Sequence, residues 1–518
     1  MPHENDIRTS RRRTLAVTTV FIASFLVMLD LSISAIILPA IRFELHAGLS
    51  ELQWFFDAYT LCFASLVLVG GTISDRLGHR AGLLVSIATF TVGSVMCAVA
   101  DNVGLLIAGR AVQGVAAALL VPGAMAMISH LAGDQARRAR LLGAWGGLSG
   151  AAIAFGPPLG GWLTDAFGWR SIFWINVPLG IVVAVLVAVL LPRPPAGART
   201  RFDWPGMLLG VAAVLLLAFA VIEGRSFGWT SPVIVGCLVG SVLAAVAFVV
   251  VERRVANPMV DLALFRDRAF GTASVAGFVL GFGLSTSFYF LSLYLQQVLG
   301  FNALSAGLGF MPAAVALSVA AGVTGKLMPT VGPRVLLVAG LAVGAVGLVG
   351  LSFAGPRTSY LVLVPAVLLI GVGWGLALPV VTAVALASSP PERAGVASGT
   401  VETSLQLGTV IGIAALGTLQ AARFVADLTD RLAGQVSAAD LSGVIDAIVN
   451  GRDVTVAGWS TEQLTTAVTS AFGAGTGLAF LVAGVTTAVV AAIAFVGTPR
   501  RLPDAQPQPS PTEEHASA

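Results

Sequence analysis

Three acidic residues lie inside long apolar runs of this sequence. Asp30 and Asp57 fall in the first two runs and Glu402 in a later one, in a chain of 518 residues that is 56% hydrophobic and only 11% charged. A carboxylate at the centre of a bilayer costs about 3 kcal/mol on insertion scales, so such residues mark a transport pathway, a charged partner or a proton site. A carboxylate removed from water also holds a proton more readily and can carry one. These residues predict movement of a solute across a membrane.

The elements that must position these acids are runs of roughly 18–27 mostly apolar residues, each able to cross a ~30 Å hydrocarbon core as a helix. We count fourteen, centred near residues 27, 62, 90, 117, 152, 181, 213, 241, 281, 315, 344, 372, 409 and 485. No period-2 pattern runs through them, which argues against a transmembrane barrel. The 59 glycines suit helices that pack closely in lipid. We therefore expect an all-α integral membrane protein with fourteen transmembrane helices.

Basic residues are divided unevenly between the two sides that alternating loops would face. With the N-terminus inside, 21 of the 29 lie inside, seven lie outside and Arg110 falls within a span. The positive-inside rule then places both termini in the cytoplasm. The first run is too long for a signal-peptide core and carries Asp30, so it is expected to remain as a helix. The net charge of +3 is thus a topology signal, and no nucleic-acid partner is expected.

The loops indicate two related halves. The run from Gly71 to Arg80 follows the second span, and a shorter run from Gly325 to Arg334 follows the tenth. Spans 1–6 and 9–14 therefore form two six-helix bundles, and a duplicated bundle places its substrate site near the midplane, between halves that rock about it. The expected divisions are a cytoplasmic tail 1–13, an N-terminal bundle 14–192, a linker with inserted helices 7 and 8 over 193–255, a C-terminal bundle 256–499 with an extracytoplasmic loop about 422–470, and a disordered cytoplasmic tail 500–518.

The run from Gly71 to Arg80 resembles the loop 2–3 motif of the major facilitator superfamily, with His79 in place of the commoner Arg. Over roughly residues 10–500 the chain looks like a fourteen-helix drug:proton antiporter of that superfamily. The resemblance implies a conformational gating role for Gly71, Asp75, Arg76, Gly78 and Arg80. Asp75 near the positive dipole end of helix 3 could clamp a neighbouring helix until rocking breaks the contact. The alternative is a basic loop that only sets the topology.

Two further motifs carry the resemblance in the first half. Arg110 stands in a run similar to the helix-4 motif, and Asp30 in one similar to the helix-1 signature that ends in Pro39. In relatives this Arg faces the acid of helix 1, so the resemblance implies an Asp30–Arg110 pair that couples transport to protons. The alternative is a salt bridge that only fixes packing.

The fifth span resembles the motif that distinguishes exporters within the superfamily. Its gating residues are expected to be Gly156, Pro157, Gly160 and Gly161. Small residues on one face of this span permit close helix approach, and Pro157 bends the helix. The stripe alone would also fit ordinary tight packing, but together with the other motifs it favours export.

Substrate-binding residues are expected in both halves. Glu402 and Gln406 share a polar stripe with Ser398 and Thr409, and such a stripe should line the central cavity because lipid exposure would be costly. Other expected contacts are Asp57, which matches a residue of many relatives, and the aromatic Tyr289 and Tyr294. The alternatives are a solvated structural role for Asp57 and a lipid-facing or interfacial position for the tyrosines.

The sequence thus predicts a proton-coupled efflux transporter that exports an antibiotic or other amphipathic compound by alternating access. We expect Asp30, tuned by Arg110, to take up the proton, and Glu402 and Asp57 to attract a cationic or polar substrate. The expected partners are the drug, protons and the lipid bilayer, with no cofactor, metal or catalytic residue, in a functional monomer. One lysine against 28 arginines suggests a GC-rich bacterial genome and an inner-membrane location. The alternative is a proton-coupled importer of a small nutrient; an enzyme or receptor lacks any matching motif.

Overall fold

The computed structural model describes residues 2–132, 135–192, 203–255, 262–389, 394–433, 443–445, 447–448 and 459–501. Within these residues the chain is helical, with no β-strand. The helices of the first half are α1 (Pro2–Ile33), α2 (Leu38–Leu45), α3 (Leu49–Leu77), α4 (His79–Ala98), α5 (Val103–Ala132), α6 (Gln135–Phe167) and α7 (Arg170–Leu190). The next pair is α8 (Trp204–Phe227) and α9 (Pro232–Glu252). The second half contains α10 (Arg268–Leu293), a π-helical turn η2 (Tyr294–Val298), α11 (Ala303–Leu308), α12 (Met311–Val331), α13 (Pro333–Ser352), α14 (Tyr360–Ala387), α15 (Ala394–Leu432) and α17 (Thr461–Gly497).

Every one of the fourteen predicted span centres falls within a helix of this set. Twelve helical stretches in the described part of the chain are long and apolar enough to cross a membrane. The other two predicted positions are occupied by α3 and α6, of 29 and 33 residues. Helices satisfy their own backbone hydrogen bonds, which a bilayer core demands because it offers no water. The predicted all-α fold is confirmed.

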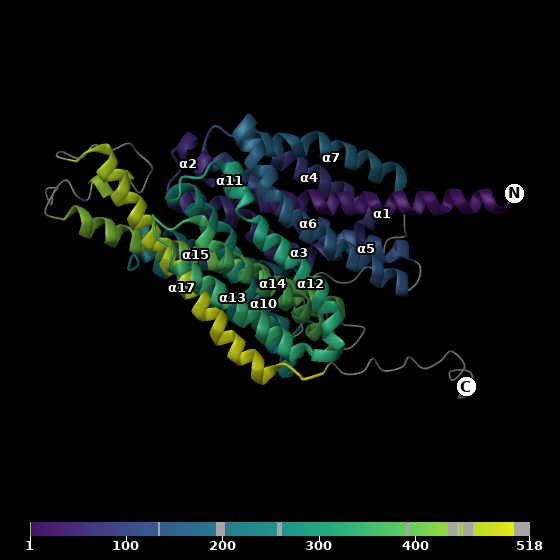
Figure 1. Ribbon diagram of the computed structural model, residues 1–518. Coiled ribbons are helices and arrows are strands. Elements are labelled where there is room, and N and C mark those ends of the chain that lie inside the picture. The colour runs from purple at the N-terminus through teal and green to yellow at the C-terminus, as the bar shows by residue number, and fades with distance from the viewer. Residues whose placement is uncertain are drawn as a thin grey trace.

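The helices pack as two bundles (Figure 1). Helices α8 and α9 form an additional pair that packs on each other. In the first bundle α5 packs on α3 and α4, α7 on α4, and α1 on α6; in the second, α14 packs on α12 and α13, and α15 on α10. The inserted α8 touches α3 of one bundle and α15 of the other, whereas α9 packs mainly on α8. One buried apolar cluster is confined to the first bundle, and a larger one continues across both.

Matching turns mark the internal duplication. Gly78 separates α3 from α4 with φ +80°, and Gly332 separates α12 from α13 with φ +87°. This left-handed region is strained for residues with a Cβ, so glycine suits both turns. The two halves therefore reverse direction in the same way at the place where the sequence motif repeats.

Hydrogen bonds between described residues join the two halves only at the end of the molecule that carries α2 and α11, which we call the α2–α11 end. Ser292 donates to the carbonyl of Ala35 at 2.6 Å, and Gln296 donates to that of Ile36 at 3.0 Å. Pro39 has no N–H to donate to Ala35, so the turn between α1 and α2 leaves this carbonyl free for the other half. The start of α1 and the end of α17 lie at the opposite end of the molecule (Figure 1).

The helix boundaries modify several predicted divisions in detail. Residues 2–13, expected as a tail, belong to α1, although the side chains of 2–12 lie outside the described residues. Helix α15 continues to Leu432 and α17 begins at Thr461, so both helices extend into the segment expected as a loop over about 422–470. Residues 502–518 of the predicted tail lie outside the described part.

Candidate functional site

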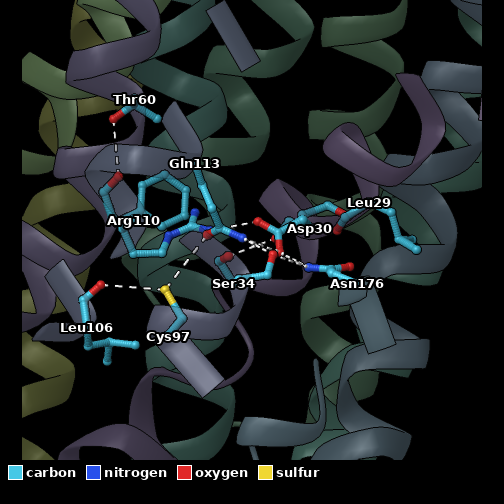
Figure 2. A network of polar contacts seen from close by, with 12 residues as sticks. Leu29, Asp30, Ser34, Thr60, Cys97, Leu106, Arg110, Gln113 and Asn176 are labelled. Carbon is cyan, nitrogen blue, oxygen red and sulfur yellow. Dashed lines mark hydrogen bonds and ion pairs between the residues drawn. The ribbon is translucent and has the colours of Figure 1, made fainter. Parts of the chain in front are cut away.

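The carboxylate of Asp30 is the centre of a buried polar network within the first half (Figure 2). Asp30 on α1 is 2% exposed and accepts three side-chain hydrogen bonds. Arg110 of α5 donates to its Oδ2 at 2.6 Å, while Asn176 of α7 and Gln113 of α5 donate to Oδ1 at 2.7 and 3.4 Å. Charge-assisted bonds of this kind are the stronger ones in proteins. The Asp30–Arg110 pair that the resemblance implied is therefore present. Together the three donors compensate the negative charge of Asp30.

Arg110 is held in place by more than its acid partner. Its side chain is fully buried, with its guanidinium carbon 4.5 Å from the ring centre of Tyr59 and 5.2 Å from that of Phe55. The same Nη1 also donates to Gln113 at 2.8 Å. Its Nε and Nη2 have no hydrogen-bond acceptor among the described residues. A cation placed against two aromatic faces gains from their quadrupoles, so α3 contributes to the site through its rings.

A second set of hydrogen bonds fixes the side-chain amides of Gln113 and Asn176. Ser94 of α4 accepts from Gln113 at 2.8 Å and from Asn176 at 3.4 Å. Sequence reasoning missed Asn176 and Ser94. Asn176 carried a usable signal, since it is a lone amide inside the sixth apolar run, whereas one serine among many small residues did not.

Asp57 is buried in a very different way. It lies on α3 with 0% exposure, and neither carboxylate oxygen has a hydrogen-bond partner among the described residues. It is close enough to Tyr289 of α10 to interact electrostatically, and the neighbouring Phe56 makes an edge contact with the Tyr289 ring at 6.2 Å. Asp57 therefore lies on the side of α3 that meets the second half, and it is not the solvated residue of the alternative interpretation.

Glu402 and Gln406 form a local pair on α15. Gln406 donates to the Glu402 carboxylate at 2.9 Å; Gln406 is buried and Glu402 partly so. Thr409 of the same predicted stripe donates to the carbonyl of Gly281 on α10 at 3.3 Å. The C-terminal member of the stripe therefore faces α10. The side chain of Ser398 lies outside the described residues.

The two predicted tyrosines are packed inside the protein. Tyr289 is 2% exposed and Tyr294 1%. The Tyr294 hydroxyl donates to the carbonyl of Gly355 at 2.9 Å, within the second half. Neither ring faces lipid, so the interfacial alternative does not describe them; their role in binding substrate stays a prediction.

The glycines of the exporter-like motif let α6 approach two neighbours. A Cβ on Gly156 would overlap Ser32 of α1, and one on Gly160 would lie 2.6 Å from a methyl carbon of Ile33. On Gly161 it would meet the backbone of Ala303 at the start of α11, and the carbonyl of Pro157 closely approaches Gly307. Helix α6 therefore contacts the end of the Asp30 helix and the second half at once, at the α2–α11 end.

The predicted loop motif is described only in part. Gly71, Asp75 and Arg76 belong to α3, but their side chains lie outside the described residues. Gly78 forms the turn, and Arg80 donates to the carbonyl of Ala188 near the end of α7. A cation there suits the free carbonyls and negative dipole end of a helix.

Arg42 makes a further connection between the halves that the sequence did not predict. Arg42 of α2 donates to Gln297 of η2 at 3.2 Å and to the carbonyl of Ile448 at 3.1 Å. It was counted only as one of the few basic residues of the outer loops. Its partners come from distant parts of the chain, and no local pattern identifies them.

The family of the chain follows from comparison with known proteins. A family model described as Major Facilitator Superfamily matches residues 20–413. The chain belongs to this superfamily. Its members are transporters rather than enzymes, and with the apolar helices described above the chain is a multi-pass membrane transporter.

Several curated relatives are named for resistance or export. The chain is 34% identical over 423 residues to Multidrug resistance protein Stp of Mycobacterium tuberculosis, covering 82% of this chain and 79% of the relative. It is 38% identical over 420 residues to Cephamycin export protein CmcT of Amycolatopsis lactamdurans, covering 80% and 86%. It is 31% identical over 505 residues to the Tetracenomycin C resistance and export protein of Streptomyces glaucescens, covering 95% and 94%. These relatives support drug efflux by a transporter of the superfamily.

A solved structure has the same fold. It is an inward-facing, unoccupied form of a bacterial homolog of the human lysosomal transporter Spinster, with a TM-score of 0.67, 17% identity, and coverage of 94% of this chain and 97% of that one.

Proposed function

We propose that the protein exports an antibiotic or similar amphipathic compound in exchange for protons, by alternating access between its two halves. The observation that carries the proposal is the buried ion pair between Asp30 of α1 and Arg110 of α5, because the segment that directly follows α1 is hydrogen-bonded to the second half. Asp30 can bind or release a proton, and α1 can transmit the resulting change in position to the contacts with the second half.

Proton binding acts first on the Asp30 network. A proton on Asp30 removes the charge that Arg110 and the two amides compensate, and the ion pair loses its attraction. Five residues further along the chain, in the turn that follows α1, the carbonyl of Ala35 accepts the bond from Ser292 of the other half. A shift of α1 therefore loosens contacts at the α2–α11 end, where the glycines of α6 also meet α1 and α11. Protonation and separation of the halves at this end are thereby linked.

The substrate is recognised by the acids that lie outside that network. Glu402 is partly accessible and has only Gln406 as a described hydrogen-bond partner, so it can attract a cationic or polar group. Asp57 lies toward the junction of the halves and gains access when they part. The names of two relatives refer to cephamycin and tetracenomycin C, which supports an antibiotic as the substrate.

Transport in everted membrane vesicles tests this function. With an acidified lumen, such vesicles should accumulate members of a panel of antibiotics and dyes, and a protonophore should release them. Accumulation that survives collapse of the pH gradient would contradict proton coupling. Accumulation by right-side-out vesicles alone would favour the importer, whose substrate moves inward.

The orientation is part of the same proposal. We place both termini in the cytoplasm of a bacterial inner membrane, with the α2–α11 end outside and the protein acting as a monomer. A cysteine at the exposed Thr230, between α8 and α9, should then react with an impermeant thiol reagent from outside intact cells. Reaction only after the cells are opened would place the α8–α9 turn in the cytoplasm and contradict the proposed orientation.

A further inference from the structure

A surface groove lies in the second half, where the loop between α13 and α14 meets α15 and α17. Its volume is about 540 Å³, within the ~300–1,000 Å³ that is usual for sites that hold small ligands. Residues 352–356 form one wall, and α17 between Ser470 and Leu481 forms the other. Both walls are mostly apolar, and among the described residues that line the groove Arg431 of α15 is the one with a charge.

Two neighbouring helices place this groove at the edge of the hydrocarbon core. Helix α13 has 20 residues, about the number that crosses a ~30 Å core. Near its start Arg334 donates to the carbonyl of Thr498, just beyond α17, at 2.7 Å. At its end, a Cβ on Gly477 of α17 would lie 2.8 Å from the carbonyl of Ser352. The part of α17 before Gly477 therefore projects out of the core, and the groove, which spans Ser470 to Leu481, straddles the boundary.

The apolar floor of the groove continues into a surface that faces lipid. Leu481, Val485 and Val489 follow one another at intervals of four residues, which places them on one face of α17. They are 39%, 52% and 55% exposed, and Phe353 at the edge of the groove is 82% exposed. On a helix that crosses a bilayer, such side chains contact hydrocarbon. An acyl chain that lies along this face of α17 runs into the groove.

Arg431 supplies a polar end to the groove. Its side chain is 43% exposed, and its Nε donates to Asp427, one turn earlier on α15, which is its one hydrogen bond among the described residues. A guanidinium has five N–H donors, so its two Nη groups can still bind a phosphate. Side chains on a helix point toward its N-terminus, and for α15 this is the direction of the membrane. The cation therefore lies at the level where lipid headgroups are found.

We propose that this groove binds a phospholipid, with one acyl chain along α17 and the phosphate accepting hydrogen bonds from Arg431. Charge complementarity and continuity with the lipid-facing surface identify this occupant. A free phosphate ion would leave the apolar floor empty, and a lipid without a phosphate would leave the cation unmatched. The proposal rests on the proposed function only for the leaflet, which is the outer one when the α2–α11 end lies outside.

Binding of fluorescent lipids to the full-length protein in an uncharged detergent tests the site. Phosphatidylglycerol and diacylglycerol that carry the same labelled acyl chain differ in the phosphate headgroup, and empty micelles correct for partition into detergent. By fluorescence anisotropy the wild type should bind phosphatidylglycerol about 5-fold more tightly, the contribution of one arginine near a charged lipid. An excess of inorganic phosphate should not displace it. Equal affinity for the two lipids, or displacement by inorganic phosphate, would overturn the proposal.

Variants locate the bound lipid. Arg431→Gln should lower the affinity for phosphatidylglycerol to that for diacylglycerol and leave diacylglycerol binding unchanged. Arg423→Gln removes an exposed arginine of the same helix that does not line the groove, and this matched control should keep the wild-type preference. Asp427→Asn releases Arg431 from its acid partner and should increase the preference. Ala474→Trp fills the groove and should weaken both lipids together. A wild-type preference in Arg431→Gln, or unaffected binding in Ala474→Trp, would reject this site.

The design separates this inference from the proposed function. The assay requires neither a gradient nor a membrane orientation, so the lipid preference can hold even if vesicles do not exchange drug for protons. Conversely, vesicles can transport normally while the two lipids bind equally, which would reject only the lipid site. If Ala474→Trp does not fold, the wild-type comparison of the two lipids and the Arg431→Gln variant still decide the outcome.

Discussion

Asp30 and Asp57 are two carboxylates of the same half, both buried, and their surroundings are opposite. Asp30 accepts hydrogen bonds from Arg110, Asn176 and Gln113, all within the first bundle. Asp57 has no hydrogen-bond partner among the described residues and lies toward Tyr289 of the second bundle. The environment of Asp30 can therefore move as one body, whereas that of Asp57 must change when the halves separate. Two equally buried acids can therefore have different roles, and their hydrogen-bond partners distinguish them.

The difference also sets the energetic cost of each charge. A buried ion pair suffers strongly when one partner is removed, since the other charge is left without compensation. A lone buried charge is costly from the outset. A charge on Asp57 would therefore be costly in the present arrangement of the helices.

The largest expected effect is on the compensated site. Arg110→Met leaves the charge of Asp30 buried with only two amides, and should lower the free energy of unfolding by about 3–5 kcal/mol. The measurement is a denaturant titration in mixed lipid–detergent micelles. In the double variant Arg110→Met/Asp30→Leu most of the loss should be recovered, because no buried charge remains. A single variant as stable as the wild type would show that the pair is not the compensated site described here.

A smaller effect is expected at the acid of the other half. If Glu402 attracts cations, Glu402→Gln should weaken their export selectively, by about 1–3 kcal/mol or roughly 5- to 150-fold in affinity. Concentration dependence of efflux for cationic and neutral dyes measures this. Glu402→Asp should partly restore the cations. Equal losses for every substrate would assign Glu402 a structural or proton-coupling role.

Asp57→Asn should leave stability almost unchanged. No described hydrogen bond is lost, so the free energy of unfolding should stay within about 1 kcal/mol of the wild type. The same denaturant titration as for Arg110→Met gives the comparison directly. A loss as large as that of Arg110→Met would remove the contrast between the two acids.

The smallest effect concerns an exposed acid at the α2–α11 end. Partial burial raises the pKa of Glu44, but hydrogen bonds from Arg170 and Trp169 and the charge of Arg170 outweigh it, so this pKa lies below its ordinary value of 4.5. The stabilisation is present above pH 4.5 and is lost as pH falls through the lower folded value. The effect is small because the Glu44 side chain is 49% exposed. The difference in unfolding temperature between wild type and Glu44→Gln should shrink between pH 7 and pH 3.5; a difference that grows would reverse the sign.

The sequence predicts the helical architecture well for a physical reason. A bilayer-spanning helix needs a long apolar run, so fourteen such runs, with the turn glycines Gly78 and Gly332, mark the helices and their duplication. The Asp30–Arg110 pairing was implied by the resemblance to the superfamily; the residues alone indicate only that a charge inside an apolar run needs a partner.

The remaining contacts depend on how distant helices meet. The bond from Ser292 to the carbonyl of Ala35 needs the relative position of both halves, and the local signal is only Pro39. The aromatic cluster around Tyr294 is visible in the sequence, but the partner of its hydroxyl, the carbonyl of Gly355, is not.

Proton movement by the purified protein tests the central claim most directly. In proteoliposomes with an acid lumen and an enclosed pH dye, the compound that wild-type vesicles transport best should accelerate alkalinisation of the lumen as it enters in exchange for protons. Asp30→Asn should still bind the compound but give no acceleration, because an amide cannot titrate. Alkalinisation in Asp30→Asn at the wild-type rate would contradict the account, since the proton would then travel by a path that does not include Asp30.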